Sequence, residues 1–218
     1  MLKPHNVVIS AALLVATVFT AAFTHADDTT TKPATGFVPK IYFSLGGLKL
    51  DTDPAQLDGS TYQVDKGFLI GGGGLRALPY ANSYWDWSLL IGGNEENIDS
   101  GTCVTTNGDY VGCNYAVTTV VAALPVTANM YYPINDKLKV SAGLGGSITM
   151  LYFDAGLEAD GYQSKGTDTT SSITITPVLQ AAITYDRVQF KILQQMSIGN
   201  SETGKGSATF FTLNWLNK

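Results

Sequence analysis

The sequence predicts an all-β protein: an eight-stranded antiparallel up-and-down transmembrane β-barrel with short periplasmic turns and long external loops. Three observations predict this fold. The chain begins with an export signal, its later segments are strand-like, and the connections between them alternate between short and long. Charged residues make up only 14% of the chain, against about 25% in soluble domains. No later segment approaches the ~20 consecutive apolar residues of a membrane helix.

The N-terminus sets the compartment. Lys3 precedes an uncharged apolar run over residues 7–23, and small residues lead to Ala26. This order predicts a secretory signal peptide over 1–26. A retained membrane anchor is the alternative, because the run is about as long as the shortest spanning helix. The polar residues 27–37 are predicted to form a flexible periplasmic lead-in, and 38–218 the barrel, located in the bacterial cell outer membrane.

Eight strand-like segments occupy the rest of the chain. Most contain ten residues or more, which matches the ~9–11 residues that a tilted strand needs to cross a bilayer. In chain order they are 40–46, 67–78, 84–92, 116–132, 137–153, 172–185, 188–198 and 208–216.

The connections between these segments fall into two classes. Strands that run up and down place every second connection on the same side, and outer-membrane barrels have short turns on one side and long loops on the other. The short connections have turn-forming residues and are 79–83, 133–136 and 186–187. The long connections are polar and are 51–66, 97–114, 154–171 and 199–207.

Side-chain alternation assigns the two faces of each strand. In segment 137–153, Leu144 and Ile148 belong to an apolar face, while Gly145 and Thr149 belong to a polar one. Segments 84–92 and 172–185 alternate in the same way. We assign the apolar face to lipid and the polar face to the lumen. A soluble barrel such as a lipocalin would reverse this assignment. The export signal, the strand length and the alternation of short and long connections favour a barrel whose outer face contacts lipid.

Aromatic residues gather near the predicted short-turn end. An aromatic girdle at the membrane interface predicts this position, and packing within hairpins is the alternative. The predicted girdle is Tyr80, Tyr84, Trp85, Tyr131, Tyr132, Tyr185 and Trp215.

Four charges are predicted to face the lumen: Arg76, Asp86, Lys139 and Lys191. An eight-stranded barrel is only wide enough for side chains to fill it, so these charges should be paired. Arg76 and Asp86 are nearly symmetric about the turn 79–83, which predicts that they face each other. A selectivity filter is the functional alternative. Gln194 falls on the lipid face of segment 188–198, which calls for a bulge or a different register.

Catalytic chemistry is not predicted. His5 and His25 both lie in the segment expected to be removed, which excludes a histidine base and a histidine-ligated zinc from the mature chain. We therefore expect no enzyme activity, no cofactor and no metal site. Cys103 and Cys113 lie in one long connection and are predicted to form a disulfide in an exported chain. The glycines 71–74 are attributed to close strand packing or to strand curvature.

The chain resembles the small outer-membrane barrels of the OmpA-barrel, OmpX, OmpW and opacity-protein kind. The resemblance covers residues 38–218 and is carried by the signal peptide, the strand count, the loop sorting and the hairpin Tyr131 to Gly145. It implies a structural or surface-interaction role in envelope integrity, adhesion or host contact. A narrow channel for small or apolar molecules is the alternative, and a soluble periplasmic lipid-binding barrel is a third.

The interior distinguishes the first two functions. A continuous hydrophilic lumen would favour the channel, and a lumen filled by Tyr42, Phe68, Arg76 and Asp86 would favour the structural role. Expected partners are outer-membrane lipid and lipopolysaccharide, the barrel-assembly machinery, and a host or surface ligand at the loops. The chain has a net charge of −5 and no basic stripe, so nucleic acid is not an expected partner.

Overall fold

The computed structural model describes residues 40–52, 55–57, 60–62, 65–104, 107–108, 110–159, 162–200 and 203–217. Residues 55–57, 60–62, 96–104, 111–116, 155–159 and 162–168 are described by their backbone alone. The predicted signal peptide 1–26 and lead-in 27–37 lie outside the described residues.

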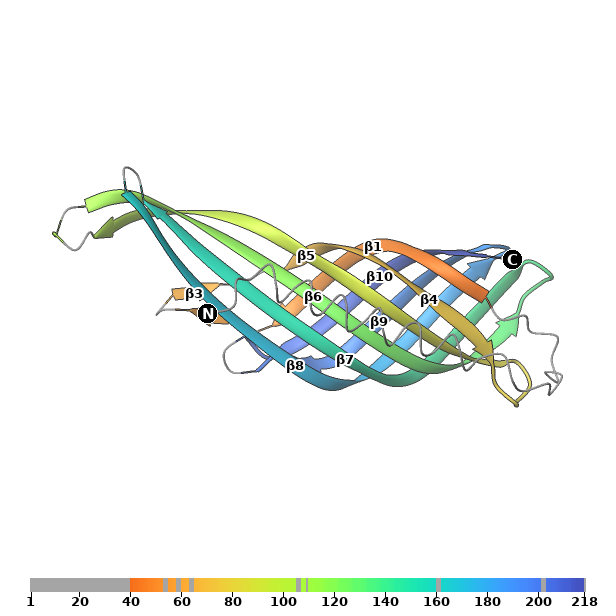
Figure 1. Cartoon of the computed structure of the whole chain (residues 1–218). Helices are drawn as coiled ribbons and strands as arrows, with labels where there is room; N and C mark the ends of the chain where they lie inside the picture. The colour runs from red at the N-terminus through yellow and green to blue at the C-terminus, as the bar shows by residue number, and fades with distance from the viewer. Residues whose placement is uncertain are drawn as a thin grey trace. The chain divides into compact units, whose positions relative to one another are not determined.

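Eight antiparallel strands close into a barrel in the order β1-β10-β9-β8-β7-β6-β5-β4 (Figure 1). The predicted closed antiparallel up-and-down barrel of eight strands is therefore confirmed. Among the described residues, no helix is long and apolar enough to cross a membrane. Two short strands, β2 (Ala55–Leu57) and β3 (Ser60–Tyr62), pair with each other in a separate sheet. The barrel strands are β1 (Lys40–Thr52), β4 (Lys66–Ala77), β5 (Ser83–Val104), β6 (Tyr110–Pro133), β7 (Leu138–Ala159), β8 (Tyr162–Tyr185), β9 (Val188–Ile198) and β10 (Gly206–Leu216).

The short connections all lie at one end of the barrel, which we call the short-turn end. The backbone there takes a positive φ at Asn82 and Asp186, 55° and 51°, residue types that tolerate this conformation. In the turn after β6, the side chain of Asn135 accepts hydrogen bonds from the backbone N–H groups of Lys137 and Leu138 at 2.9 and 2.8 Å. Local hydrogen bonding thus explains why these connections are tight.

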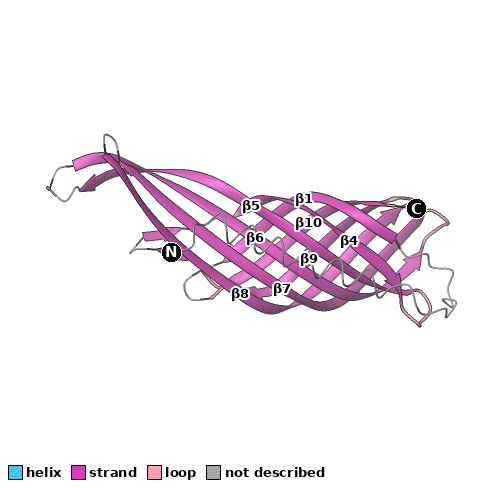
Figure 2. Ribbon diagram, viewed as in Figure 1, coloured by secondary structure: helices cyan, strands magenta, loops and turns pink. Residues whose placement is uncertain are grey.

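The opposite end, which we call the long-connection end, differs from the prediction. Segments 97–114 and 154–171 were predicted as loops, but most of their residues continue the strands β5 to β8, which contain 22, 24, 22 and 24 residues. These four strands run beyond β4 and β9, which contain 12 and 11 (Figure 2). Most of the added residues are polar, so these segments lack the alternation of apolar and polar residues that marks a strand in the sequence. The Thr, Val and Tyr residues among them nevertheless favour strand formation.

The outer surface of the barrel carries an unbroken apolar row. Following the paired residues once around the barrel from Ile183 on β8 leads back to β8 at Ile173, ten residues earlier. A displacement of this kind is the stagger that tilted strands require to close. Every member of the row is apolar: Ile183, Phe190, Leu213, Leu45, Ile70, Ile91, Ala122, Met150 and Ile173.

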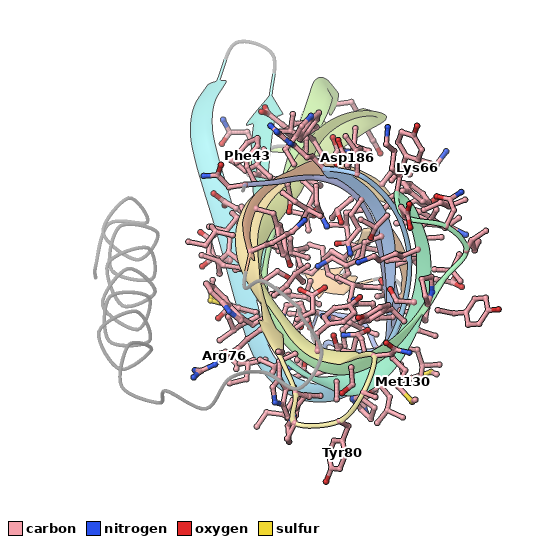
Figure 3. The ribbon with its side chains drawn as sticks, turned by 90° about the vertical axis from the view of Figure 1, so that its right-hand side faces the viewer. Phe43, Lys66, Arg76, Tyr80, Met130 and Asp186 are labelled. Carbon is pink, nitrogen blue, oxygen red and sulfur yellow. The ribbon has the colours of Figure 1, made fainter. Side chains whose placement is uncertain are left out.

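The predicted alternation agrees with the burial of side chains on β5, β7 and β8. Leu144 on β7 is 69% exposed and points outward, whereas Thr149 on the same strand is fully buried. Figure 3 shows Phe43, Lys66 and Met130 on the outside of the barrel wall. The apolar face of these strands is therefore the outer face.

Candidate functional site in the barrel interior

A buried ion pair lies inside the barrel, in the half toward the short-turn end. Asp86 on β5 and Lys191 on β9 are 2% and 1% exposed, and the Lys191 ammonium lies 3.1 Å from the nearer carboxylate oxygen of Asp86. The two strands are not neighbours in the sheet, so the pair crosses the lumen. Two charges removed from water in this way need each other and further hydrogen bonds to be tolerated.

Neighbouring side chains supply those hydrogen bonds. The Tyr42 hydroxyl donates to Asp86 Oδ1 at 2.5 Å and accepts from Lys191 Nζ at 2.6 Å. The Gln180 amide donates to Asp86 Oδ2 at 2.8 Å and accepts from the Thr127 hydroxyl at 2.7 Å. Because the charges and their partners come from β1, β5, β6, β8 and β9, the network ties together strands that are far apart in the sequence.

Glycines make room for this network. Gly73 on β4 pairs directly with Tyr42 on the neighbouring strand β1. A Cβ at Gly73 would stand 2.5 Å from the Tyr42 hydroxyl and 2.2 Å from the Trp87 carbonyl oxygen. Both distances are below contact, so no side chain fits. The predicted close packing at glycines 71–74 therefore has a specific use here, since it admits the Tyr42 ring.

Gly73→Ala is expected to destabilise the barrel by about 1–3 kcal/mol, the usual cost of overpacking an interior. The added methyl must displace Tyr42 or the β5 backbone. Gly47→Ala is the matched control, because a Cβ there meets its nearest atom at 3.7 Å. Urea midpoints of the two variants measure the effect, and equal midpoints would contradict it.

The predicted lumen charges occupy three different environments. Asp86 and Lys191 face the lumen and pair with each other. Lys139 is half-buried near the short-turn end, where its ammonium lies 5.1 Å from the centre of the Tyr131 ring. Arg76 is exposed outside the barrel wall (Figure 3), so its prediction as a lumen charge was wrong. The hairpin register pairs Leu75, not Arg76, with Asp86.

The predicted aromatic girdle is corrected at two positions. Tyr80, Trp85, Tyr132, Tyr185 and Trp215 are exposed on the outside. Tyr84 is buried and Tyr131 packs against it inside the barrel, with ring centres 6.2 Å apart. Each of these two residues directly precedes an outward aromatic, Trp85 or Tyr132. Consecutive strand residues point to opposite faces, so both members of such a pair cannot join one girdle.

The lumen toward the long-connection end holds a large apolar cluster, which lies beside buried polar side chains such as Thr149 and Gln195. Fourteen buried residues form one cluster there, with members from all eight barrel strands. The predicted lumen was polar, and this apolar cluster corrects the prediction. Among the four predicted plugging residues, Tyr42 and Asp86 lie inside, whereas Arg76 and the 62% exposed Phe68 lie outside. The cluster is Leu48, Leu50, Leu69, Leu90, Val117, Val121, Ala123, Leu151, Phe153, Val178, Leu193, Ile198, Ala208 and Phe210.

Two further predicted residues concern strand register. Gln194 does point away from the lumen, and its amide oxygen accepts a hydrogen bond of 2.6 Å from the Thr209 hydroxyl on β10. The register of β9 with β10 shifts only beyond this pair, between the partners of Gly206 and Ala208. The outward polar residue therefore fits the strand without a bulge at Gln194 itself.

The predicted disulfide lies where side chains are not described. The backbone pairs Cys103 on β5 with Val111 on β6, and Cys113 is two residues further along β6. The two cysteines therefore share one face of the same hairpin as diagonal neighbours. The disulfide stays a prediction.

The site offers charge and hydrogen bonding. In the part of the chain that the structure describes, no cluster of His, Cys, Asp or Glu could hold a metal ion. Sequence reasoning missed Tyr42 as a hydrogen-bond partner, and also Gln180 and Thr127. Gln180 and Thr127 did carry a signal, since each is a polar residue at an inward position of its strand.

The chain is similar to the attachment invasion locus protein Ail of Yersinia pestis in complex with the heparin analogue sucrose octasulfate. Identity is 10%, the TM-score is 0.42, and the match covers 83% of this chain and 100% of that one. A second structure of Ail matches with the same identity and coverage and a TM-score of 0.36. No protein-family model and no curated protein matches the chain.

Proposed function

We propose that the chain is an integral protein of the bacterial outer membrane with a closed interior, serving envelope structure and surface interaction. The observation that carries this proposal is the unbroken outward apolar row around the barrel. Lipid is the environment that accommodates such a surface, because a barrel in water would expose its apolar side chains on every strand.

The filled interior supports a structural role over conduction. The apolar cluster crosses the lumen with members from every barrel strand, and a second layer holds the pair Asp86 and Lys191. A continuous water path would have to pass both layers. Opening it would separate two buried charges, which is costly.

The long-connection end is the surface we propose to face outward from the cell. Strands β5 to β8 extend beyond the barrel there, and outer-membrane barrels place their longer connections externally. The extension supports a role in adhesion or host contact. Proposed partners are outer-membrane lipid and lipopolysaccharide, the barrel-assembly machinery, and a host or surface ligand at this end.

Heat-modifiability of the outer-membrane fraction tests the location. We expect the unboiled protein to migrate differently from the boiled protein on a gel, because a folded barrel resists the detergent. We also expect it in the membrane pellet. Recovery in the soluble periplasmic fraction without detergent would contradict the proposal and favour a soluble ligand-binding barrel.

Planar bilayer recordings test the closed interior. Purified barrel is expected to insert without producing steady single-channel conductance, because side chains fill the lumen. A stable conductance that scales with the amount of inserted protein would contradict a closed interior and make the channel the better function. A barrel with an open lumen, recorded in the same bilayer, controls for insertion.

A further inference from the structure

Three buried side chains lie together at the seam of the barrel, where the first strand β1 pairs with the last strand β10 (Figure 1). Ser44 on β1 and Asn214 on β10 are direct cross-strand partners, and Thr212 lies two residues from Asn214 on the same inward face. All three are at most 1% exposed. Their oxygen atoms, Ser44 Oγ, Thr212 Oγ1 and Asn214 Oδ1, have no hydrogen-bond partner within the described part of the chain.

The side chains around the seam do not supply the missing partners. Asn214 uses its amide nitrogen to donate to the Gln189 side chain at 2.9 Å, which leaves its amide oxygen free to accept. Lys191 is the cross-strand partner of Thr212, but its ammonium donates to Asp86. A buried polar atom without a partner is costly, and native proteins satisfy such atoms with protein groups or with ordered water.

The wall beside the two hydroxyl groups is made of small residues. On the side away from Asn214, Ser44 pairs with Gly71, and Thr212 pairs with Gly46 across the seam. The Leu90 side chain reaches over Gly71, whereas the three atoms nearest to a Cβ at Gly46 all belong to the β10 backbone. Side chains just fill the lumen of an eight-stranded barrel, so a position without a side chain leaves room for a small molecule.

Apolar layers lie on both sides of this position along the lumen. Tyr42 and Leu216 belong to the small cluster toward the short-turn end. Leu48 and Phe210 belong to the large apolar cluster toward the long-connection end. A molecule bound between these layers must be small, and it must both donate to the asparagine oxygen and accept from the hydroxyl groups. Water has this size and hydrogen-bonding capacity.

We propose that Ser44, Thr212 and Asn214 bind a buried water molecule that joins β1 to β10. The water donates to Asn214 Oδ1 and accepts from the hydroxyl groups of Ser44 and Thr212. Three hydrogen bonds are the usual number for a buried water molecule. This inference goes beyond the proposed function, because it depends on the closed barrel and not on where the barrel is located.

The direction of a stability change tests the site. Thr212→Val keeps the shape of the side chain and removes the hydroxyl group that binds the water. We expect the ratio of folded to unfolded protein at a fixed urea concentration to fall about fivefold, the usual effect of losing one hydrogen bond. A dry hydroxyl group would be costly to keep, so an unchanged or higher ratio would overturn the proposal. Urea unfolding of the full chain in phosphatidylcholine vesicles measures the ratio.

Thr119→Val is the matched control. The Thr119 hydroxyl on β6 is also buried without a partner, but its inward neighbours along the strand are Val117 and Val121 of the large apolar cluster. A water molecule needs two to four polar partners, and these two valines supply none. The ratio should therefore stay unchanged or rise. A fall equal to that of Thr212→Val would show that the loss of any buried hydroxyl is costly, and would overturn the assignment.

A double-mutant cycle tests whether one water molecule serves both strands. Ser44→Ala alone should also lower the ratio of folded to unfolded protein. In the double variant Ser44→Ala/Thr212→Val, the combined loss should be smaller than the product of the two single losses, because the first substitution already weakens the water. Losses that multiply without coupling would mean that the two hydroxyl groups do not share a partner, which contradicts the proposal.

Nuclear Overhauser spectroscopy of the methyl-labelled barrel in detergent micelles detects the water directly. The Thr212 methyl group is expected to show a cross-peak to water that weakens in Ser44→Ala. The Thr119 methyl group controls for exchange of a threonine's own hydroxyl proton, and it should show no comparable peak. A folded barrel without the Thr212 cross-peak would overturn the site. Each variant is first checked for heat-modifiability. Recovery of the unmodified chain in the soluble fraction would contradict the proposed location but not this water site.

Discussion

Lys191→Met should lower the free energy of unfolding by about 3–5 kcal/mol, because it leaves the Asp86 carboxylate buried without a cation. Methionine keeps the length of the side chain but provides no proton for Asp86 or for the Tyr42 hydroxyl. The remaining donors to the carboxylate, from Tyr42 and Gln180, are neutral. The barrel should therefore unfold at a lower urea concentration and lose its heat-modified band at a lower temperature.

A second substitution tests whether the loss comes from the unpaired charge. Asp86→Asn in the Lys191→Met background should recover much of the lost stability, because asparagine accepts the hydrogen bond from Tyr42 without carrying a charge. A double-mutant cycle then gives a coupling energy between the two positions. Lys139→Met is the control, since Lys139 is only half-buried, and its loss should cost under about 1 kcal/mol. Additive losses at 86 and 191 would show that the pair does not act as a unit.

The fold could be predicted because its signals are local. Strand β9 spans Val188–Ile198, the range predicted from the sequence, because a two-residue turn fixes one end and apolar alternation marks its length. Strand β8 was predicted to begin at residue 172 but begins at Tyr162. Its first residues are polar on both faces, so the loss of apolar alternation was taken as the end of the strand.

The candidate site could be predicted only in part, for two physical reasons. A shift of one residue in a hairpin exchanges inside and outside, which explains why Arg76 lies outside although Asp86 lies inside. The partner of Asp86 is Lys191, more than a hundred residues away in the chain. Such a contact depends on how the barrel closes and on its stagger, and neither is encoded within one hairpin.

The polar half of the interior, toward the short-turn end, also depends on contacts between strands that the sequence of one strand does not reveal. Tyr42 reaches Asp86 because Gly73 on the neighbouring strand has no side chain. The sequence marks Gly73 as a place of close approach, but it does not say which side chain approaches. The strand pattern thus predicts which side chains point into the lumen, whereas the contacts between these side chains depend on how the barrel closes.

Leu144→Arg is the substitution that most directly separates a membrane barrel from a soluble one. Leu144 points outward from β7 and is 69% exposed. On β7 it lies between Leu138 at the short-turn end and the outward Asp154 toward the long-connection end, so it belongs to the middle of the apolar surface. An arginine at the bilayer midplane of a membrane barrel costs about 2–4 kcal/mol. In water, the same change at an exposed position should fall within about 0.5 kcal/mol.

Refolding into phosphatidylcholine vesicles from urea measures this difference. The Leu144→Arg variant should fold with a lower midpoint and a smaller heat-modified fraction than the unmodified chain. Thr169→Arg is the matched control, because Thr169 is also exposed on the outer face but pairs with Asp154, beyond the apolar row, and should fold normally. Equal midpoints for both variants would mean that Leu144 faces water. The outward apolar row would then be a protein-binding surface and not the surface that contacts lipid.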